Sequence, residues 1–121
     1  LVQPIALDSE RSIAGVVASA SVLALTTGLI EEMLFRGLIQ RAAANFLGPL
    51  PGLLYVSVLY TVLASATWNA VGIAVVFTIA LALAALTTYT RSVVPAAAAH
   101  ASLNVGVLLA AASVVAGVGL R

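Results

Sequence analysis

The chain has 121 residues, of which 63% are hydrophobic and 7% are charged, and its mean hydropathy is +1.20. That composition leaves too little polar surface for a soluble domain, so the sequence predicts a protein that lies in a lipid bilayer. A net charge of +1 without a basic stripe argues against nucleic-acid binding, and zero cysteines with one histidine argue against disulfides, thiolate catalysis and a zinc site. We therefore expect no metal and no other cofactor.

The first predicted element is a transmembrane helix from Ser12 to Ile30, an uncharged run that is long enough to cross a bilayer. A polar stretch from Asp8 to Arg11 precedes it and suits the membrane interface. Apolar residues then continue at helical spacing, so we expect an amphipathic extension to about Leu47, ended by Gly48-Pro49-Leu50-Pro51-Gly52. Because the chain begins at Leu1, we expect a processed product or a piece of a longer protein.

Three further apolar runs predict helices from about Leu53 to Thr67, from Ala70 to Thr90, and from a turn at Ser92–Pro95 to about Gly119. Trp68 and Asn69, between the first two of these runs, suit the membrane interface. The expected fold class is all-α. We expect residues 1–121 to form one domain, a polytopic integral membrane bundle of about four transmembrane helices.

Four ionisable residues fall at membrane depth, namely Glu31, Glu32, Arg36 and His100. Each costs about 2.5–3.5 kcal/mol to insert, so each requires a partner or a function. Glu32 and Arg36 are spaced i, i+4 with the acid first, the favourable order for an intrahelical ion pair, and chemistry alone favours a structural role for them. Glu31 has no such partner on its own helix, which favours a functional role.

Glu31 and His100 are predicted to lie at similar depth. We take Arg41 and Arg91 as markers of one membrane face. At 1.5 Å per residue, Glu31 then lies roughly 15 Å inside and His100 roughly 14 Å inside. Asn104 follows His100 by one helical turn, so the two side chains are expected to point the same way. A buried carboxylate can activate water, and His with Asn can donate to an oxyanion, so hydrolysis without a covalent nucleophile fits these residues.

Two motifs carry a family resemblance. Glu31-Glu32-x-x-x-Arg36 and His100-x-x-x-Asn104 resemble the motifs of the CPBP family of membrane proteins, which contains the CAAX prenyl endopeptidases and bacteriocin-processing or immunity proteins. The resemblance extends from the first predicted helix to the fourth. The Arg91–Pro95 segment that leads to the histidine is also similar to the last motif of the family.

The resemblance implies a glutamic intramembrane endopeptidase. In this interpretation Glu31 activates a water molecule, and Glu32 and Arg36 support the site. His100 and Asn104 stabilise the oxyanion. The substrate is then a prenylated or transmembrane peptide that loses a short C-terminal piece, the bilayer is the other partner, and the protein is a multi-pass protein of a prokaryotic cell membrane.

The middle motif of the family is altered in this chain. It is an aromatic residue followed four positions later by a histidine that shares the water with the first glutamate, and Tyr60 to Ala64 occupies its place, so Ala64 replaces the histidine. Thr61 or Asn69 is an alternative group to hold the water. Three hypotheses stay open: a weakened or unconventional peptidase, a non-catalytic binding, immunity or scaffold protein, and part of a proton or ion pathway through Glu31.

Overall fold

The computed structural model describes residues 9–64 and 69–119, which are helical apart from short turns. The elements are α1 (Ser9–Glu32), the π-helix η1 (Met33–Ile39), α2 (Gln40–Leu47), α3 (Pro49–Ala64), α4 (Ala70–Thr90) and α5 (Val94–Gly119). The predicted all-α fold class is confirmed. The helix predicted from Leu53 begins four residues earlier, and its predicted end at Thr67 and the neighbouring Trp68 lie outside the described residues.

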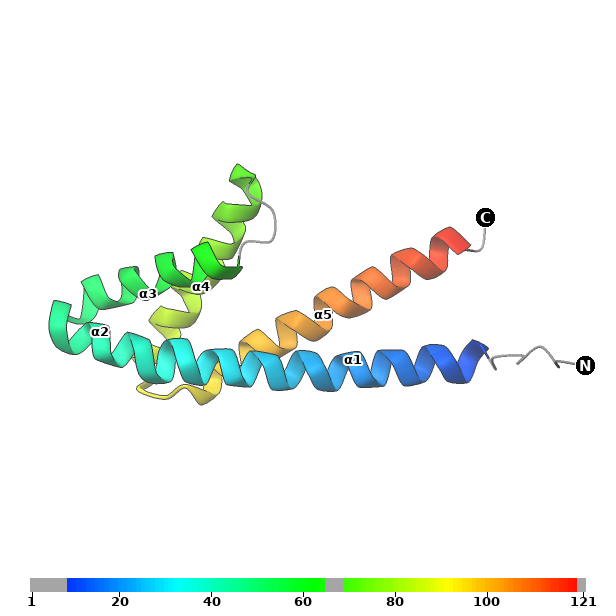
Figure 1. Cartoon of the computed structure of the whole chain (residues 1–121), viewed down its shortest axis with the longest axis horizontal. Coiled ribbons are helices and arrows are strands. Elements are labelled where there is room, and N and C mark those ends of the chain that lie inside the picture. Colours follow the sequence, from blue (N-terminus) through cyan, green and yellow to red (C-terminus); the bar gives the residue numbers. More distant parts are fainter. Residues whose placement is uncertain (1–8, 65–68, 120–121) are drawn as a thin grey trace, which may run out of the picture.

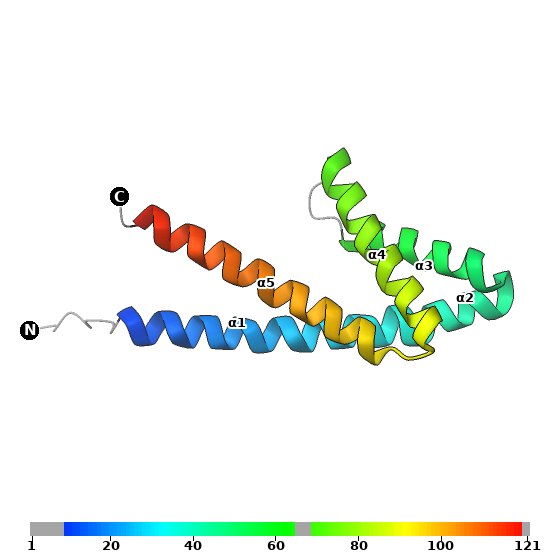
Figure 2. The same cartoon turned by 180° about the vertical axis from the view of Figure 1, so that it is seen from behind.

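α1, η1 and α2 follow one another as one long helical rod, residues 9–47 (Figure 1). α3 folds back along α2, α4 packs against α3, and α5 returns beside α1. Figure 2 shows from behind that α5 diverges from α1 toward its last turn, and that the start of α1 and the end of α5 lie at the same end of the molecule. The passage from α1 into η1 therefore lies where α3 and α5 both reach the rod.

Within the described residues, three segments have the length and apolar character needed to cross a membrane, Val17–Leu47, Ala70–Thr90 and Val94–Val114. α3 is also apolar but has 16 residues, about 24 Å of helix against a hydrocarbon core of about 30 Å. The described residues thus contain three segments of spanning length and one shorter helix, where the sequence predicted about four spans. The protein is a multi-pass integral membrane protein.

Apolar side chains cover the outside of the molecule and polar side chains occupy part of the inside. Large apolar residues are widely exposed, up to 89% for Phe46, which lipid favours and water does not. The buried polar and charged residues are Glu32, Arg36, Gln40, Ser57, Thr61, Thr87 and His100. Exposed hydroxyl groups such as those of Thr26 and Ser102 donate to carbonyls of their own helix, which satisfies them in hydrocarbon.

A sharp turn at Gly48 ends the rod. Its φ of 92° lies in the left-handed region that glycine adopts without strain. α3 then begins at Pro49, inside the segment that we expected to separate two helices, because the first turn of a helix does not use the N–H that proline lacks. Gly52 brings α3 close to α2, since a Cβ there would lie 2.6 Å from the backbone nitrogen of Ala44.

The last two helices begin at side-chain caps. The side chain of Asn69 accepts a hydrogen bond from a backbone N–H in the first turn of α4 at 2.7 Å. Arg91 ends α4 with a φ of 54°, and Ser92 Oγ accepts from the backbone N–H of Val94 at 3.2 Å. The predicted turn before the last helix is therefore confirmed, and α5 is helical as far as Gly119, the last described residue.

Candidate active site

A row of buried residues lies along the rod because part of the rod is π-helical. Gly28, Glu32, Arg36 and Gln40 recur every four residues and are all buried. In an α-helix four residues overshoot a full turn by about 40°, so such a row would wind around the helix. In the wider π-helix η1, four residues fall short of a full turn instead. The rotation in the α-helical part and the rotation in η1 therefore offset each other, and the row stays on one side of the rod. The spacing is visible in the sequence, but the residue types of η1 do not predict a π-helix.

Glu32 and Arg36 form the predicted ion pair. Arg36 Nη1 lies 2.9 Å from Glu32 Oε1, and both side chains are fully buried. Nη2 of the arginine donates to the carbonyl of Ala80 on α4 at 3.2 Å, and the guanidinium carbon lies 4.6 Å from the centre of the Tyr60 ring. The opposite charge and the aromatic face both reduce the cost of burying the guanidinium in a membrane. Arg36 thus connects the rod with α3 and α4.

Glu31 is the more accessible of the two glutamates, with 34% of its side chain exposed. Tyr60 on α3 donates its hydroxyl hydrogen to Glu31 Oε2 at 2.9 Å. The same hydroxyl oxygen lies 3.4 Å from Nε2 of His100 on α5, and Nε2 lies 3.8 Å from Glu31 Oε2. The structure therefore brings Glu31 and His100 together, as their similar depth predicted, and adds Tyr60 as a third member.

The shorter contact of His100 is with Glu32. Nδ1 of the imidazole lies 2.8 Å from Glu32 Oε1. With Glu32 as a carboxylate, which only accepts hydrogen bonds, we assign a hydrogen to Nδ1; Nε2 is the nitrogen that faces Tyr60 and Glu31. The sequence does not predict this contact, because neighbouring residues lie about 100° apart around a helix and the packing decides which one faces α5.

Asn104 does not contact the glutamates that His100 reaches but binds the backbone of α1. It lies one turn beyond His100, and its Nδ2 donates to the carbonyl of Ala24 on α1 at 3.2 Å. Gly28 allows this close approach of α1 and α5, because a Cβ there would lie 3.2 Å from the backbone nitrogen of Ala101. The shared face that we expected for His100 and Asn104 is therefore divided: the histidine reaches the glutamates and the asparagine reaches the backbone of the rod.

Of the altered motif, Tyr60 to Ala64 on α3, only Tyr60 reaches the site. Ala64 lies exposed at the end of the described part of α3 and has no polar side-chain atom. Thr61, one of the two alternative water holders, donates to the carbonyl of Ser57 on its own helix at 2.7 Å, and Asn69 caps α4. The motif predicts only an aromatic ring at Tyr60. Its hydroxyl at membrane depth was the signal of a further site residue.

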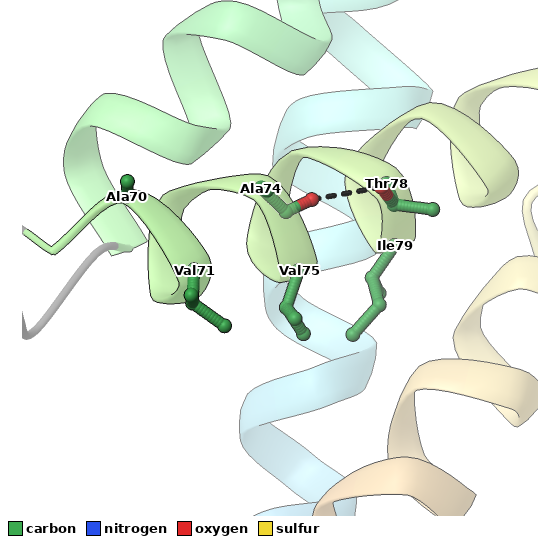
Figure 3. A pocket seen from close by; sticks show the side chains of 6 residues that line it. All are labelled: Ala70, Val71, Ala74, Val75, Thr78 and Ile79. Carbon is green, nitrogen blue, oxygen red and sulfur yellow. Dashed lines mark hydrogen bonds between the residues drawn. The ribbon is translucent and has the colours of Figure 1, made fainter.

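An apolar hollow of about 510 Å³ lies along one face of α4 (Figure 3). Val71, Val75 and Ile79 project from the same side of the helix, and the hydroxyl of Thr78 donates to the carbonyl of Ala74 at 2.7 Å. This face therefore presents hydrocarbon and suits an apolar neighbour. In the part of the chain that the structure describes, no three His, Cys, Asp or Glu side chains are arranged to hold a metal ion.

Comparison with known proteins supports the family resemblance. No curated protein and no solved structure matches the chain. A protein family matches residues 13–106, the segment that contains Glu31, Tyr60, His100 and Asn104, and its description is type II CAAX prenyl endopeptidase Rce1-like. The resemblance to the CPBP family, which includes the CAAX prenyl endopeptidases, is thereby confirmed. The chain belongs to the Rce1-like family of type II CAAX prenyl endopeptidases.

Proposed function

We propose that this protein is an intramembrane endopeptidase in which Glu31 activates water to cleave prenylated or otherwise membrane-held peptides near their C-terminus. The proposal rests on the contact between a partly exposed carboxylate and a histidine, with Glu31 Oε2 and His100 Nε2 3.8 Å apart beside the Tyr60 hydroxyl. A partly exposed carboxylate is a suitable general base for a water molecule bound beside it. Membership of the family supplies the class of reaction, peptide-bond hydrolysis in a membrane.

In the proposed reaction Glu31 takes a proton from a water molecule while the oxygen of that water attacks the carbonyl carbon of the scissile peptide bond. The oxyanion that forms accepts a hydrogen bond from Nε2–H of His100 in its imidazolium form, while Nδ1–H stays with Glu32. As the C–N bond breaks, the proton held by Glu31 passes to the leaving nitrogen. The products are a carboxylic acid and an amine, and Glu31 is again a carboxylate.

The charges of the site balance in this form. The proposed mechanism uses Glu31 and Glu32 as carboxylates and His100 as an imidazolium, so that with Arg36 the four charges sum to zero. A neutral cluster costs far less in hydrocarbon than an isolated charge. Glu32 lies 2.9 Å from the arginine and 2.8 Å from the histidine, so we assign it the role of holding both cations.

We assign Asn104 a supporting role that differs from the one implied by the resemblance. Its Nδ2 is bound to the carbonyl of Ala24, so it is not directed at a substrate carbonyl in this geometry. The bond holds α5 against α1 one turn from His100. Asn104 then acts on the oxyanion through the position of the histidine.

Cleavage of a fluorogenic farnesylated peptide by the purified chain in liposomes tests the proposal. Glu31→Ala removes the base and is expected to lower kcat by about 10²- to 10⁴-fold, and His100→Ala removes the oxyanion donor and is expected to lower it by about 10²- to 10³-fold. Thr78→Val, on the apolar face of α4, is the control and should retain the wild-type rate. Unchanged cleavage in Glu31→Ala would refute the mechanism.

A second candidate function is favoured by Ala64, which leaves the end of α3 without the imidazole of the family motif. The protein would then bind or shield membrane peptides without cleaving them. Ala64→His restores an imidazole one turn beyond Tyr60, and a weakened peptidase is expected to cleave faster with this change. If neither wild type nor Ala64→His cleaves the farnesylated peptide, and both still bind it, the second candidate is correct.

A further inference from the structure

The hydroxyl of Tyr60 takes no part in the reaction proposed above, although it contacts both Glu31 and His100, which do. It donates to Glu31 Oε2 at 2.9 Å and lies 3.4 Å from His100 Nε2. We propose that Tyr60 is a positioning residue whose hydroxyl bridges the carboxylate that activates water and the imidazole that holds the oxyanion. Its catalytic meaning rests on the proposed function, whereas the bridge itself can be tested without activity.

The Tyr60 ring is clamped by the segment that directly follows the two glutamates. Phe35 packs edge to face against it, with ring centres 5.0 Å apart and planes at 87°, and the guanidinium of Arg36 lies over its face at 4.6 Å. The residue is 8% exposed. A ring held on two sides has little freedom left to lose, so its hydroxyl is preorganised for the two groups that it meets.

The other described hydroxyl groups near this point of α3 are committed to their own helix. Ser57 Oγ donates to the carbonyl of Leu53 at 2.8 Å, and Thr61 Oγ1 donates to the carbonyl of Ser57 at 2.7 Å. Ala64, one turn beyond Tyr60, has no polar side-chain atom. The phenol of Tyr60 is thus the hydroxyl by which α3 contacts Glu31.

The bridge has a direction. With His100 as imidazolium, Nε2–H points to the phenol oxygen and the phenol O–H points to Glu31 Oε2. Because Oε2 already accepts from the phenol, we assign the proton of the attacking water to Oε1, for which no hydrogen bond is recorded among the described residues. When the oxyanion forms, it replaces the phenol oxygen as the acceptor of the hydrogen bond from Nε2–H. Tyr60 continues to donate to Glu31 and holds it in place.

Kinetics of Tyr60→Phe in liposomes provide the first test, because this change removes one oxygen and retains the clamped ring. A hydrogen bond to a charged group supports an expected fall in kcat of about tenfold to a hundredfold with KM unchanged, since the phenol touches the base and not the substrate. Tyr55→Phe, at an exposed position of the same helix, is the matched control and should match wild type. In a Glu31→Gln background Tyr60→Phe should add less than about twofold, because both changes act through one carboxylate.

The second test does not need activity. His100 is the sole histidine of the chain, so selective ¹⁵N labelling of histidine gives signals from one imidazole in the full chain in micelles. Tyr60→Phe is expected to shift the Nε2 resonance and leave Nδ1, which faces Glu32, nearly unchanged, whereas Tyr55→Phe should shift neither.

These outcomes separate the two proposals. An Nε2 resonance that is identical in wild type and Tyr60→Phe would overturn the bridge, whatever the kinetics. An Nε2 shift in a protein whose wild type does not cleave the farnesylated peptide would support the bridge and overturn the peptidase proposal. A folded Tyr60→Phe with wild-type kcat would overturn the positioning role.

Discussion

Replacing Arg36 by methionine tests whether the buried charges hold the helices together. The change removes the cation 2.9 Å from Glu32 Oε1, the hydrogen bond to the carbonyl of Ala80 and the contact with the Tyr60 ring. Removing one partner of a buried ion pair costs about 3–5 kcal/mol, because the remaining charge is left uncompensated. A desolvated cation–π contact adds about 2 kcal/mol.

One contact offsets part of that loss. His100 Nδ1 lies 2.8 Å from the same oxygen of Glu32, so the carboxylate keeps one partner after the arginine is removed. We therefore expect Arg36→Met to lower the free energy of unfolding by about 3–5 kcal/mol in total. The free energy of unfolding of a small domain is about 5–15 kcal/mol, so the expected loss is a large share of it.

The free energy of unfolding can be measured by SDS titration in mixed micelles with pulse proteolysis. Glu32→Leu should show a loss of similar size, and the double variant should lose less than the sum of the two, with an interaction energy of about 0.5–3 kcal/mol. Arg41→Met, at an exposed position on the same rod, should stay within about 0.5 kcal/mol of wild type. A loss below about 1 kcal/mol in Arg36→Met, or strict additivity with Glu32→Leu, would refute the reasoning.

Two glycine substitutions test the close approach of the helices. Gly52→Ala places a Cβ 2.6 Å from a backbone nitrogen of α2 and should cost about 1–3 kcal/mol in the same titration, whereas Gly15→Ala, with nothing within 4 Å, should cost nothing. Gly28→Ala places a Cβ 3.2 Å from a backbone nitrogen of α5, so α5 must shift by a few tenths of an ångström and carry His100 with it. We expect its kcat on the farnesylated peptide to fall at least about tenfold, and a wild-type kcat would contradict that coupling.

The course of the helices could be predicted from the sequence because it depends on the length and polarity of local runs. The uncharged run from Ala70 to Thr90 became a helix with the predicted bounds, and the rod ends at Leu47 as predicted. The start of α3 could not be placed as well. Pro49 and Pro51 are typical of segments between helices, yet the first turn of a helix accepts them, and local sequence does not separate these two cases.

Apart from the approach of Glu31 and His100, which their similar depth predicted, the pairings within the site were predicted only where they follow from one helix. Glu32 and Arg36 are four residues apart on the same rod, so their ion pair could be read from spacing. The partners of His100 and Tyr60 come from other helices, and they depend on the rotation of each helix about its axis. That rotation is set by the approach of α5 at Gly28 and by the π-helical turn of η1, neither of which the residue types predict.

The same polar groups orient the helices and form the site. In a membrane, apolar side chains gain little by leaving lipid for another helix, so small residues and polar contacts fix how helices face one another. Arg36 binds α4, Tyr60 on α3 binds the rod, and His100 on α5 binds it as well, so we expect a change at any of them to affect both the stability and the proposed cleavage rate. Ala64 lies exposed beyond these contacts. The histidine that the resemblance implies at this position would add a reactive group and is not needed for these contacts between helices, so we expect the same fold in either case, and a cleavage assay must distinguish a peptidase from a binding protein.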